Sequence, residues 1–322
     1  MKKMIALLMA VMMLVTLTAC GSAGDGGAAD DGKYNIGVCQ LVQHVALDAA
    51  TQGFVDTVNA ALGEENINWD VQNAAGDPNT CNTIVNSFVS NKVDLILANA
   101  TPALQAASAA TGSIPVLGTS VTEYGVALGI EGFTGLVGTN ISGTSDLAPL
   151  DQQAAMIREW YPDAKTVGLL YCSAEANSQY QVDEVQKLLE GLGFTCKQYS
   201  FTDSNDIQAV TQTCADENEI IYVPTDNTVA SNTGIIDGIC HGKVPVFAGE
   251  EGICSGCGVA TLSISYYDLG VATGEMAVKI LKGEANVAEM EIGYAATVTP
   301  KFNAVNCEAL NLTAPEGYVA IG

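Results

Sequence analysis

The sequence predicts an α/β fold made of two doubly wound parallel-sheet domains joined by a hinge. Short apolar runs of strand length alternate with longer segments of helical pattern from residue 33 onward. This alternation passes through two halves of similar length, residues 33–143 and 145–266. Repeated strand–helix units of this kind form parallel sheets with helices on both faces.

The predicted strands are short runs of β-branched and other apolar residues bounded by turn-forming residues. In chain order they are residues 35–39, 68–72, 94–98, 115–118, 166–171, 195–200, 219–223, 245–248 and 259–264. The helices between them begin behind residues that favour the cap position, namely Asp77, Thr101, Ser204 and Asn227. A long helix is predicted at residues 268–282 and a further extended stretch at residues 291–297.

These elements divide the chain into a leader, a tether and two lobes. We expect a signal peptide at residues 1–19 and a flexible tether at residues 20–32. The N-terminal lobe is expected to hold residues 33–143 plus about 267–295, and the C-terminal lobe residues 144–266 plus about 296–322. The turn-rich segment 139–146 is the candidate hinge between the lobes.

The first twenty residues have the pattern of a lipoprotein signal peptide. Two lysines precede an apolar run, and Leu17-Thr-Ala-Cys20 places small residues before a cysteine. The alternatives are an ordinary secretory leader or a membrane helix, but the apolar run is shorter than the roughly 20 residues a span needs. We therefore expect a lipid anchor on Cys20 that holds the protein on the outer face of the cell membrane. The glycine- and aspartate-rich residues that follow suit a flexible tether.

Composition excludes several functional classes. The net charge is −24 and no basic cluster occurs in the body, which argues against nucleic acid and anionic lipid as partners. The chain has no P-loop, no GxSxG and no HExxH, and its two histidines, His44 and His241, lie in no catalytic or metal-ligand spacing. The sequence thus predicts neither an enzyme nor a metal site, and it implies no cofactor.

Nine cysteines follow Cys20 and are scattered through predicted strands and helices. This distribution favours small buried side chains over a disulfide framework. Cys254 and Cys257 form a CxxC pair among glycines that lead into a predicted strand, so we expect a structural disulfide or idle thiols rather than redox catalysis.

Polar segments follow most of the predicted strands, and in open parallel sheets ligands bind at the carboxyl ends of the strands. These segments are residues 40–48, 99–102, 119–124, 172–178, 224–228 and 249–252. Two facing rims of hydrogen-bonding groups predict a cleft that closes on a small molecule. Tyr124, Tyr266 and Tyr267 are candidates for an aromatic lining, although core or hinge packing is the favoured interpretation.

Five segments, in order and at suitable intervals, give the chain its family resemblance: residues 37–48 (GVCQLVQHVALD), 94–102 (DLILANATP), 171–178 (YCSAEANS), 222–229 (YVPTDNTV) and 266–276 (YYDLGVATGEM). Together they resemble the ABC-transporter solute-binding lipoproteins of the tryptophan/tyrosine-binding type. The resemblance covers the whole mature body and implies a two-domain Venus-flytrap fold of the periplasmic-binding-protein type I. It also implies delivery of a small solute to an ABC permease and its ATPase subunits.

A zwitterionic amino acid needs a partner for each charge. Ser173, Asn177 and Ser178 are candidates to hold the carboxylate at a helix N-terminus, and Asp226 to hold the ammonium, with Glu250 as the next acid. Further candidates that share polar side chains in the predicted rims are Gln43, Thr101 and Asn227. Simple capping is the alternative for Ser173, Thr101 and Asn227. Two functional alternatives stay open, a ligand-sensing flytrap receptor and a binding protein for a sugar, nucleoside or vitamin.

Overall fold

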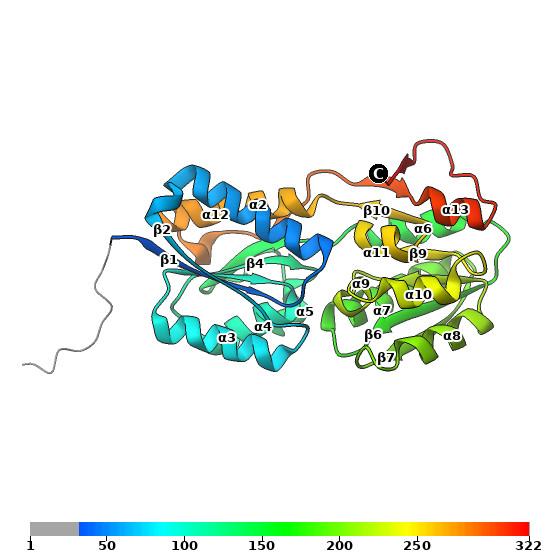
Figure 1. Cartoon of the computed structure of the whole chain (residues 1–322), viewed down its shortest axis with the longest axis horizontal. Coiled ribbons are helices and arrows are strands. Elements are labelled where there is room, and N and C mark those ends of the chain that lie inside the picture. The colour runs from blue at the N-terminus through cyan, green and yellow to red at the C-terminus, as the bar shows by residue number, and fades with distance from the viewer. Residues whose placement is uncertain (1–31, 322) are drawn as a thin grey trace, which may run out of the picture. The chain divides into compact units, whose positions relative to one another are not determined.

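The computed structural model describes residues 32–321, which form two parallel-sheet lobes (Figure 1). The first lobe is built on a six-stranded sheet in the order β11-β5-β4-β3-β1-β2, with every neighbouring pair parallel. Its strands are β1 (Tyr34–Gln40), β2 (Ile67–Asn73), β3 (Leu95–Asn99), β4 (Val116–Val121), β5 (Ile141–Ser145) and β11 (Gly293–Tyr294). Its helices are α2 (Val45–Leu62), α3 (Pro78–Asn91), α4 (Thr101–Ala110), α5 (Tyr124–Leu128) and α12 (Tyr266–Leu281), with short 3₁₀ turns at Glu64–Asn66 and Val287–Glu289.

Both faces of the first sheet are covered, as the alternation of strands and helices predicts. Phe54 and Val58 of α2 and Ala277 of α12 pack on one face, and Phe88 of α3 and Leu104 of α4 pack on the other. Figure 1 shows α2 and α12 side by side above this sheet and α3 and α4 below it.

The second lobe is built on a seven-stranded sheet in the order β13-β12-β10-β9-β8-β6-β7. The β10–β12 pair is antiparallel and the other pairs are parallel. Its strands are β6 (Thr166–Cys172), β7 (Thr195–Phe201), β8 (Ile220–Val223), β9 (Val246–Ala248), β10 (Ala260–Ser263), β12 (Thr299–Phe302) and β13 (Val319–Ala320). Its helices are α6 (Leu150–Trp160), α7 (Ala176–Gly191), α8 (Ile207–Glu217), α9 (Asn227–Ala230), α10 (Thr233–Cys240), α11 (Glu251–Cys257) and α13 (Ala304–Ala309).

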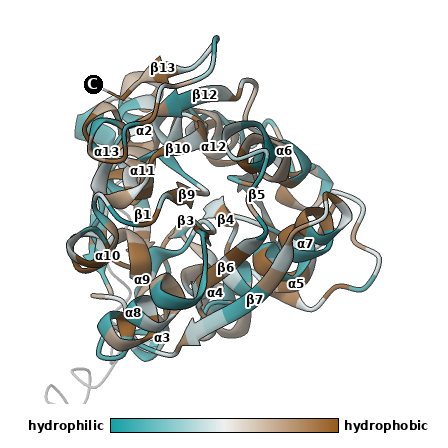
Figure 2. Cartoon of the chain, turned by 90° about the vertical axis from the view of Figure 1, so that its right-hand side faces the viewer, coloured by the Kyte–Doolittle hydropathy of each residue, from teal (hydrophilic) through white to brown (hydrophobic). Residues whose placement is uncertain are grey.

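The helices of both lobes carry hydrophobic and hydrophilic residues in alternation along their length (Figure 2), as expected for helices with one buried face. Separate apolar clusters form on the two faces of the second sheet, one around Trp160 and Val185 and one around Ile207 and Ile253. The predicted fold class is thus confirmed.

The chain crosses between the lobes three times. The crossings lie between β5 and α6, between β10 and α12, and between β11 and β12. The interpretation of residues 139–146 as a turn-rich hinge is wrong, because Ile141–Ser145 is a buried strand of the first sheet. Its small residues have a packing reason: a Cβ on Gly143 would lie 2.0 Å from the Gly118 carbonyl oxygen, so the close approach of β4 and β5 requires glycine there.

Helix starts were predicted correctly at one of four positions. Asp77 caps α3 by accepting a hydrogen bond from the Asn79 N–H at 2.9 Å. The helices expected to begin behind Thr101, Ser204 and Asn227 instead follow Ala100, Asp206 and Asp226.

All nine cysteines of residues 32–321 are free thiols, and eight of them are buried, as small core side chains would be. The CxxC pair does not lie outside a helix as expected, because both thiols belong to α11. Burial raises the pKa of Cys254 and Cys257 well above the ordinary thiol range, so neither is a thiolate at neutral pH.

No helix in this part of the chain has the length and apolar character that a membrane crossing requires. The signal peptide, Cys20 and most of the tether lie outside the described residues.

Candidate functional site

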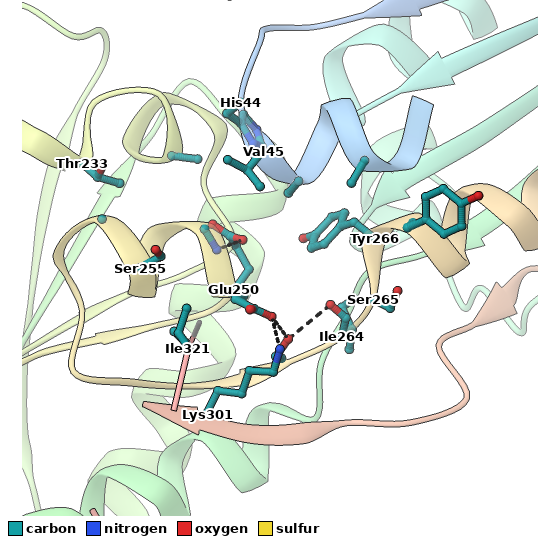
Figure 3. Close-up of a pocket in the computed structure, with 18 of the residues that line it drawn as sticks. His44, Val45, Thr233, Glu250, Ser255, Ile264, Ser265, Tyr266, Lys301 and Ile321 are labelled. Atoms are coloured by element: carbon teal, nitrogen blue, oxygen red, sulfur yellow. Dashed lines mark hydrogen bonds and ion pairs between the residues drawn. The ribbon is translucent and has the colours of Figure 1, made fainter. Parts of the chain in front are cut away.

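The carboxyl ends of strands from both sheets face a common space. A cavity of about 360 Å³ is lined by residues that directly follow β1, β2 and β3 of the first lobe and β6, β7 and β8 of the second. A larger pocket of about 790 Å³ lies at the same junction, between the start of α2, helix α11 and the start of α12 (Figure 3). The lobes therefore meet at the sheet edges where ligands of parallel sheets bind.

Five buried polar side chains near the ends of β3, β4 and β5 and in the first turn of α7 have an oxygen without a hydrogen-bond partner, and none of the five lines either of these two cavities. Within residues 32–321 eight such atoms occur, and these five are the Oδ1 atoms of Asn99, Asp146 and Asn177 and the hydroxyls of Thr101 and Ser120. Four of them follow or end the adjacent strands β3, β4 and β5, and Asn177 lies in the first turn of α7 in the opposite lobe. Because buried polar groups are normally paired, a cluster of unpaired ones at strand ends indicates a binding site.

The backbone is strained at two of these strand ends. Ala100 has φ 90° and Ser120 has φ 54°, in the left-handed region that residues other than glycine rarely adopt. The two residues are neighbours, since the Ala100 N–H donates to the Thr119 carbonyl at 3.0 Å. Such strain is concentrated at functional sites, where the surrounding fold maintains it.

Tyr266 and Glu250 line the larger pocket, and the buried Asp146 is bonded to Tyr266 and lies near Glu250. The Tyr266 hydroxyl donates to Asp146 Oδ2 at 2.8 Å, which leaves Asp146 Oδ1 free. Burial raises the pKa of Asp146, and it raises the pKa of Glu250 to about 7, with a contribution from the nearby Asp146 charge. The predicted site included Glu250 but missed Asp146, because that residue ends the segment interpreted as a hinge.

Asp226 has a structural role that the sequence did not reveal. It is only 1% exposed, its Oδ1 accepts from the Val229 N–H at 2.8 Å, and its Oδ2 accepts from the Cys172 N–H at 2.7 Å. It thus caps α9 and connects that helix to the end of β6. Burial, followed by the neighbouring Glu175 charge, raises the pKa of Asp226 to about 7. The carboxyl group expected to hold the ligand's ammonium is thus buried, and both of its oxygens already accept from backbone N–H groups.

The helix-cap interpretation of Ser173 is also wrong. Ser173 is exposed and donates to the Phe201 carbonyl at 3.2 Å, while the cap position of α7 belongs to Glu175. The buried Glu175 carboxylate accepts from the Asn227 and Thr228 N–H groups at 3.1 and 2.8 Å. A second carboxylate at the start of α7 would lie beside this charge.

Of the other predicted site residues, Ser178 is fully buried beside Asn177, with the Asn177 amide 3.3 Å from its hydroxyl. Gln43 is exposed on the rim of the larger pocket. Asn227 makes a contact between the lobes, because its Oδ1 lies 3.2 Å from His44 Nε2.

The predicted tyrosines divide into two groups. Tyr124 is 1% exposed and donates to the Thr144 carbonyl at 3.1 Å, so it is a core residue. Tyr266 lines the larger pocket together with Val45 (Figure 3), and Tyr267 also belongs to its lining. Lys301, on the same wall, is paired with Glu251, with 2.7 Å between Nζ and Oε2.

Comparison with known proteins finds a matching family and similar chains. Residues 35–320 match the family described as ABC transporter substrate binding protein. The chain is 33% identical over 295 residues to the tyrosine-binding protein of Clostridioides difficile strain R20291, covering 88% of this chain and 85% of that protein.

Two solved structures are similar over nearly the whole chain. One is an ABC domain from Streptococcus pneumoniae in complex with L-Trp, with a TM-score of 0.85 at 31% identity, covering 90% of this chain and 100% of that one. The other is the ligand-free, open structure of a substrate-binding protein with adhesive properties from Clostridium difficile, with a TM-score of 0.68 at 38% identity, covering 89% and 99%.

Proposed function

Since the chain belongs to the ABC transporter substrate-binding protein family, we propose that it binds one α-amino acid, as the zwitterion and with an aromatic side chain, between its two lobes. The observation that carries this proposal is the set of five unpartnered, buried oxygens, four at the ends of β3, β4 and β5 and one at the start of α7 in the other lobe. Hydrogen-bonding groups without partners are costly inside a protein, and a polar ligand that closes with the lobes would satisfy them.

The zwitterion is favoured over a sugar or a cation by the charges of the site. Asp146 supplies a carboxylate oxygen without a partner, which suits an ammonium group. Glu250 is nearby, so a ligand with a net negative charge would be repelled.

The aromatic side chain is supported by the lining of the larger pocket and by the relatives. Tyr266, Tyr267, Val45 and Ile264 give its wall a large apolar area. The two relatives whose ligands are given in their descriptions bind tyrosine and L-Trp.

We further propose that the protein is an importer component and not an enzyme, that it is anchored by a lipid on Cys20 to the outer face of the membrane, and that it delivers its ligand to an ABC permease with ATPase subunits. The family supports the transport role, and the leader pattern of residues 1–20 supports the anchor.

Calorimetry on protein refolded to remove carried-over ligand tests the ligand class. Titration with L-tryptophan, L-tyrosine and L-phenylalanine should give one-site binding for at least one of them, with a monosaccharide and a nucleoside as negative controls. Binding of a control compound, with no heat from any of the three amino acids, would contradict the proposal.

A further inference from the structure

We propose that Cys39 and Cys81 form a disulfide bond in the mature protein, which fastens the end of β1 to the start of α3. The bond forms while the exported chain folds, by exchange with a small-molecule or protein disulfide. This inference goes beyond the proposed function, because it concerns a covalent bond within the first lobe and does not depend on which ligand the protein binds.

The two cysteines lie on surfaces that the fold packs against each other. Alternate residues of a strand point to opposite faces of a sheet. Cys39 belongs to the apolar cluster on the α3 side of the first sheet, whereas its neighbours Ile36 and Val38 belong to the cluster on the α2 side. Cys81 belongs to the same cluster as Cys39, and both are free thiols with 0% exposure.

The packing of α3 on β1 brings the two cysteines opposite each other. The Phe88 ring of α3 lies directly over β1, since a Cβ on Gly37 would come within 2.6 Å of it. A helix that connects two parallel strands runs antiparallel to them. From this contact, two residues along β1 lead to Cys39 over about 7 Å, and seven residues back along α3 lead to Cys81 over about 10 Å. Both steps run toward the carboxyl end of the sheet, so Cys81 lies over Cys39.

The two thiols also differ from the rest in their acidity. A hydrogen bond between their side chains raises the pKa of Cys39 and lowers the pKa of Cys81. Burial raises the pKa of each of the other seven cysteines in residues 32–321. Cys81 is therefore the thiol of this pair that loses its proton more readily, and the thiolate is the form that attacks a disulfide.

The reaction is thiol–disulfide exchange, and it balances without a cofactor. The Cys81 thiolate attacks one sulfur of the oxidant, whose sulfur–sulfur bond breaks, and the leaving thiolate takes up the proton that Cys81 lost. Cys39 then loses its proton and attacks the Cys81 sulfur of the mixed disulfide, which releases the second thiol. The two cysteines lose two electrons, and the oxidant becomes two thiols. Because neither cysteine is exposed in the folded chain, the exchange precedes the packing of α3 on β1.

The place of the bond gives it a consequence for the junction of the lobes. The chain beside both cysteines lines the smaller cavity, with Leu41 after Cys39 and with Asp77 and Pro78 before Cys81. The loop closed by the bond contains α2 and β2, and such a cross-link stabilises the folded chain by restricting the unfolded one. The outer face of the membrane, where we propose that the protein is held, lacks the cytoplasmic thiols that reduce such bonds. The bond therefore holds this cavity wall in place.

Refolding of the mature chain in oxidised or reduced glutathione tests the bond, with Cys20→Ala in every sample so that no unlipidated thiol interferes. Peptide mapping by mass spectrometry should find Cys39 joined to Cys81 after oxidation, with the other seven cysteines alkylated as free thiols. The oxidised protein should unfold at a temperature higher than the reduced protein by on the order of 5–15 °C. Cys81→Ala should remove this difference. The control Cys214→Ala, which removes an equally buried thiol from α8 of the second lobe, should keep it.

Three results would overturn the proposal. The first is a map in which Cys39 and Cys81 stay free in excess oxidised glutathione, whether or not other cysteines pair. The second is an equal unfolding temperature for the oxidised and reduced protein, since a bond at this place must stabilise the fold. The third is loss of the difference in Cys214→Ala, which would assign the stabilisation to another pair. If Cys81→Ala did not fold, the map and the two unfolding temperatures of the parent chain would still decide between these outcomes.

Discussion

Asp226→Ala should destabilise the whole protein, because this buried carboxyl group joins two elements of the second lobe. Its two oxygens accept from the Val229 and Cys172 N–H groups, at the start of α9 and the end of β6. Alanine removes both acceptors, and at 1% exposure no water replaces them. The variant therefore leaves two backbone donors unpaired in the interior.

The size of the effect follows from these two donors. A buried donor without a partner costs about 1–3 kcal/mol, so Asp226→Ala should lower the free energy of unfolding by on the order of 2–5 kcal/mol. Asp226→Asn keeps one acceptor but turns an amide donor toward the other N–H group. It should lose roughly half as much.

The loss in free energy of unfolding caused by Asp226→Ala should also depend on pH. The pKa of Asp226 rises from 3.8 to about 7 on folding, chiefly through burial, so the folded state binds more protons between these values. The contribution of Asp226 to the free energy of unfolding of the wild type is therefore fully present below pH 3.8. It declines as the pH rises through 7. Because alanine does not titrate, the gap between wild type and Asp226→Ala should be larger at pH 5 than at pH 8.

Urea unfolding at pH 5 and pH 8, followed by circular dichroism, measures these differences. Asp77→Ala is the matched control, since Asp77 caps α3 in the same way but is exposed. Asp77→Ala should lower the free energy of unfolding by less, because it leaves no buried backbone donor without a partner. The reasoning would be refuted if Asp226→Ala unfolded within about 0.5 kcal/mol of the wild type at pH 5, which is the scatter expected of surface substitutions.

Three further predictions concern the anchor, the closure of the lobes and pH. Cys20→Ala should abolish incorporation of labelled fatty acid, and a labelled, membrane-bound variant would show that the lipoprotein interpretation is wrong. His44→Phe removes the contact of His44 Nε2 with Asn227 Oδ1 across the lobes, so ligand release in stopped-flow experiments should become several-fold faster, whereas an unchanged rate would exclude a role in closure. Affinity should fall from pH 8 to pH 5.5, because Glu250, whose pKa burial raises to about 7, loses its charge; calorimetry in two buffers should detect proton release on binding, and a flat profile would contradict it.

The sequence predicted the fold class because its signals are local. β1 and β3 are apolar runs between turn residues, and the helix that begins at Asp77-Pro78 has a cap followed by a proline in its first turn. β5 carries no such signal, since its residues are Ile-Ser-Gly-Thr-Ser. Their burial depends on contacts remote in the chain, such as the 2.8 Å bond between the Thr144 and Thr273 hydroxyls. A pattern within one segment could not reveal it.

The candidate site was predicted in part for the same reason. Of the polar residues expected after strands, Gln43 and Glu250 line the larger pocket and Asn227 the smaller cavity, while Thr101 and Asn177 each have a buried oxygen without a partner. What the sequence could not show was which of these side chains already have partners. Asp226 and Glu250 both follow strands and both cap short helices, of four and seven residues, that have no clear periodic pattern.

The distinction between capping and recognition rests on unpaired atoms, not on the type of residue. Glu175 and Asp226 are buried acids beside the junction, yet both of their oxygens are engaged by backbone donors. An acid in this state cannot approach a ligand without releasing a helix N-terminus, which would lose the stabilisation of the cap. Asp146 differs because Tyr266 engages one oxygen and leaves the other free. Among these three acids, Asp146 alone can accept from an ammonium while the fold stays intact.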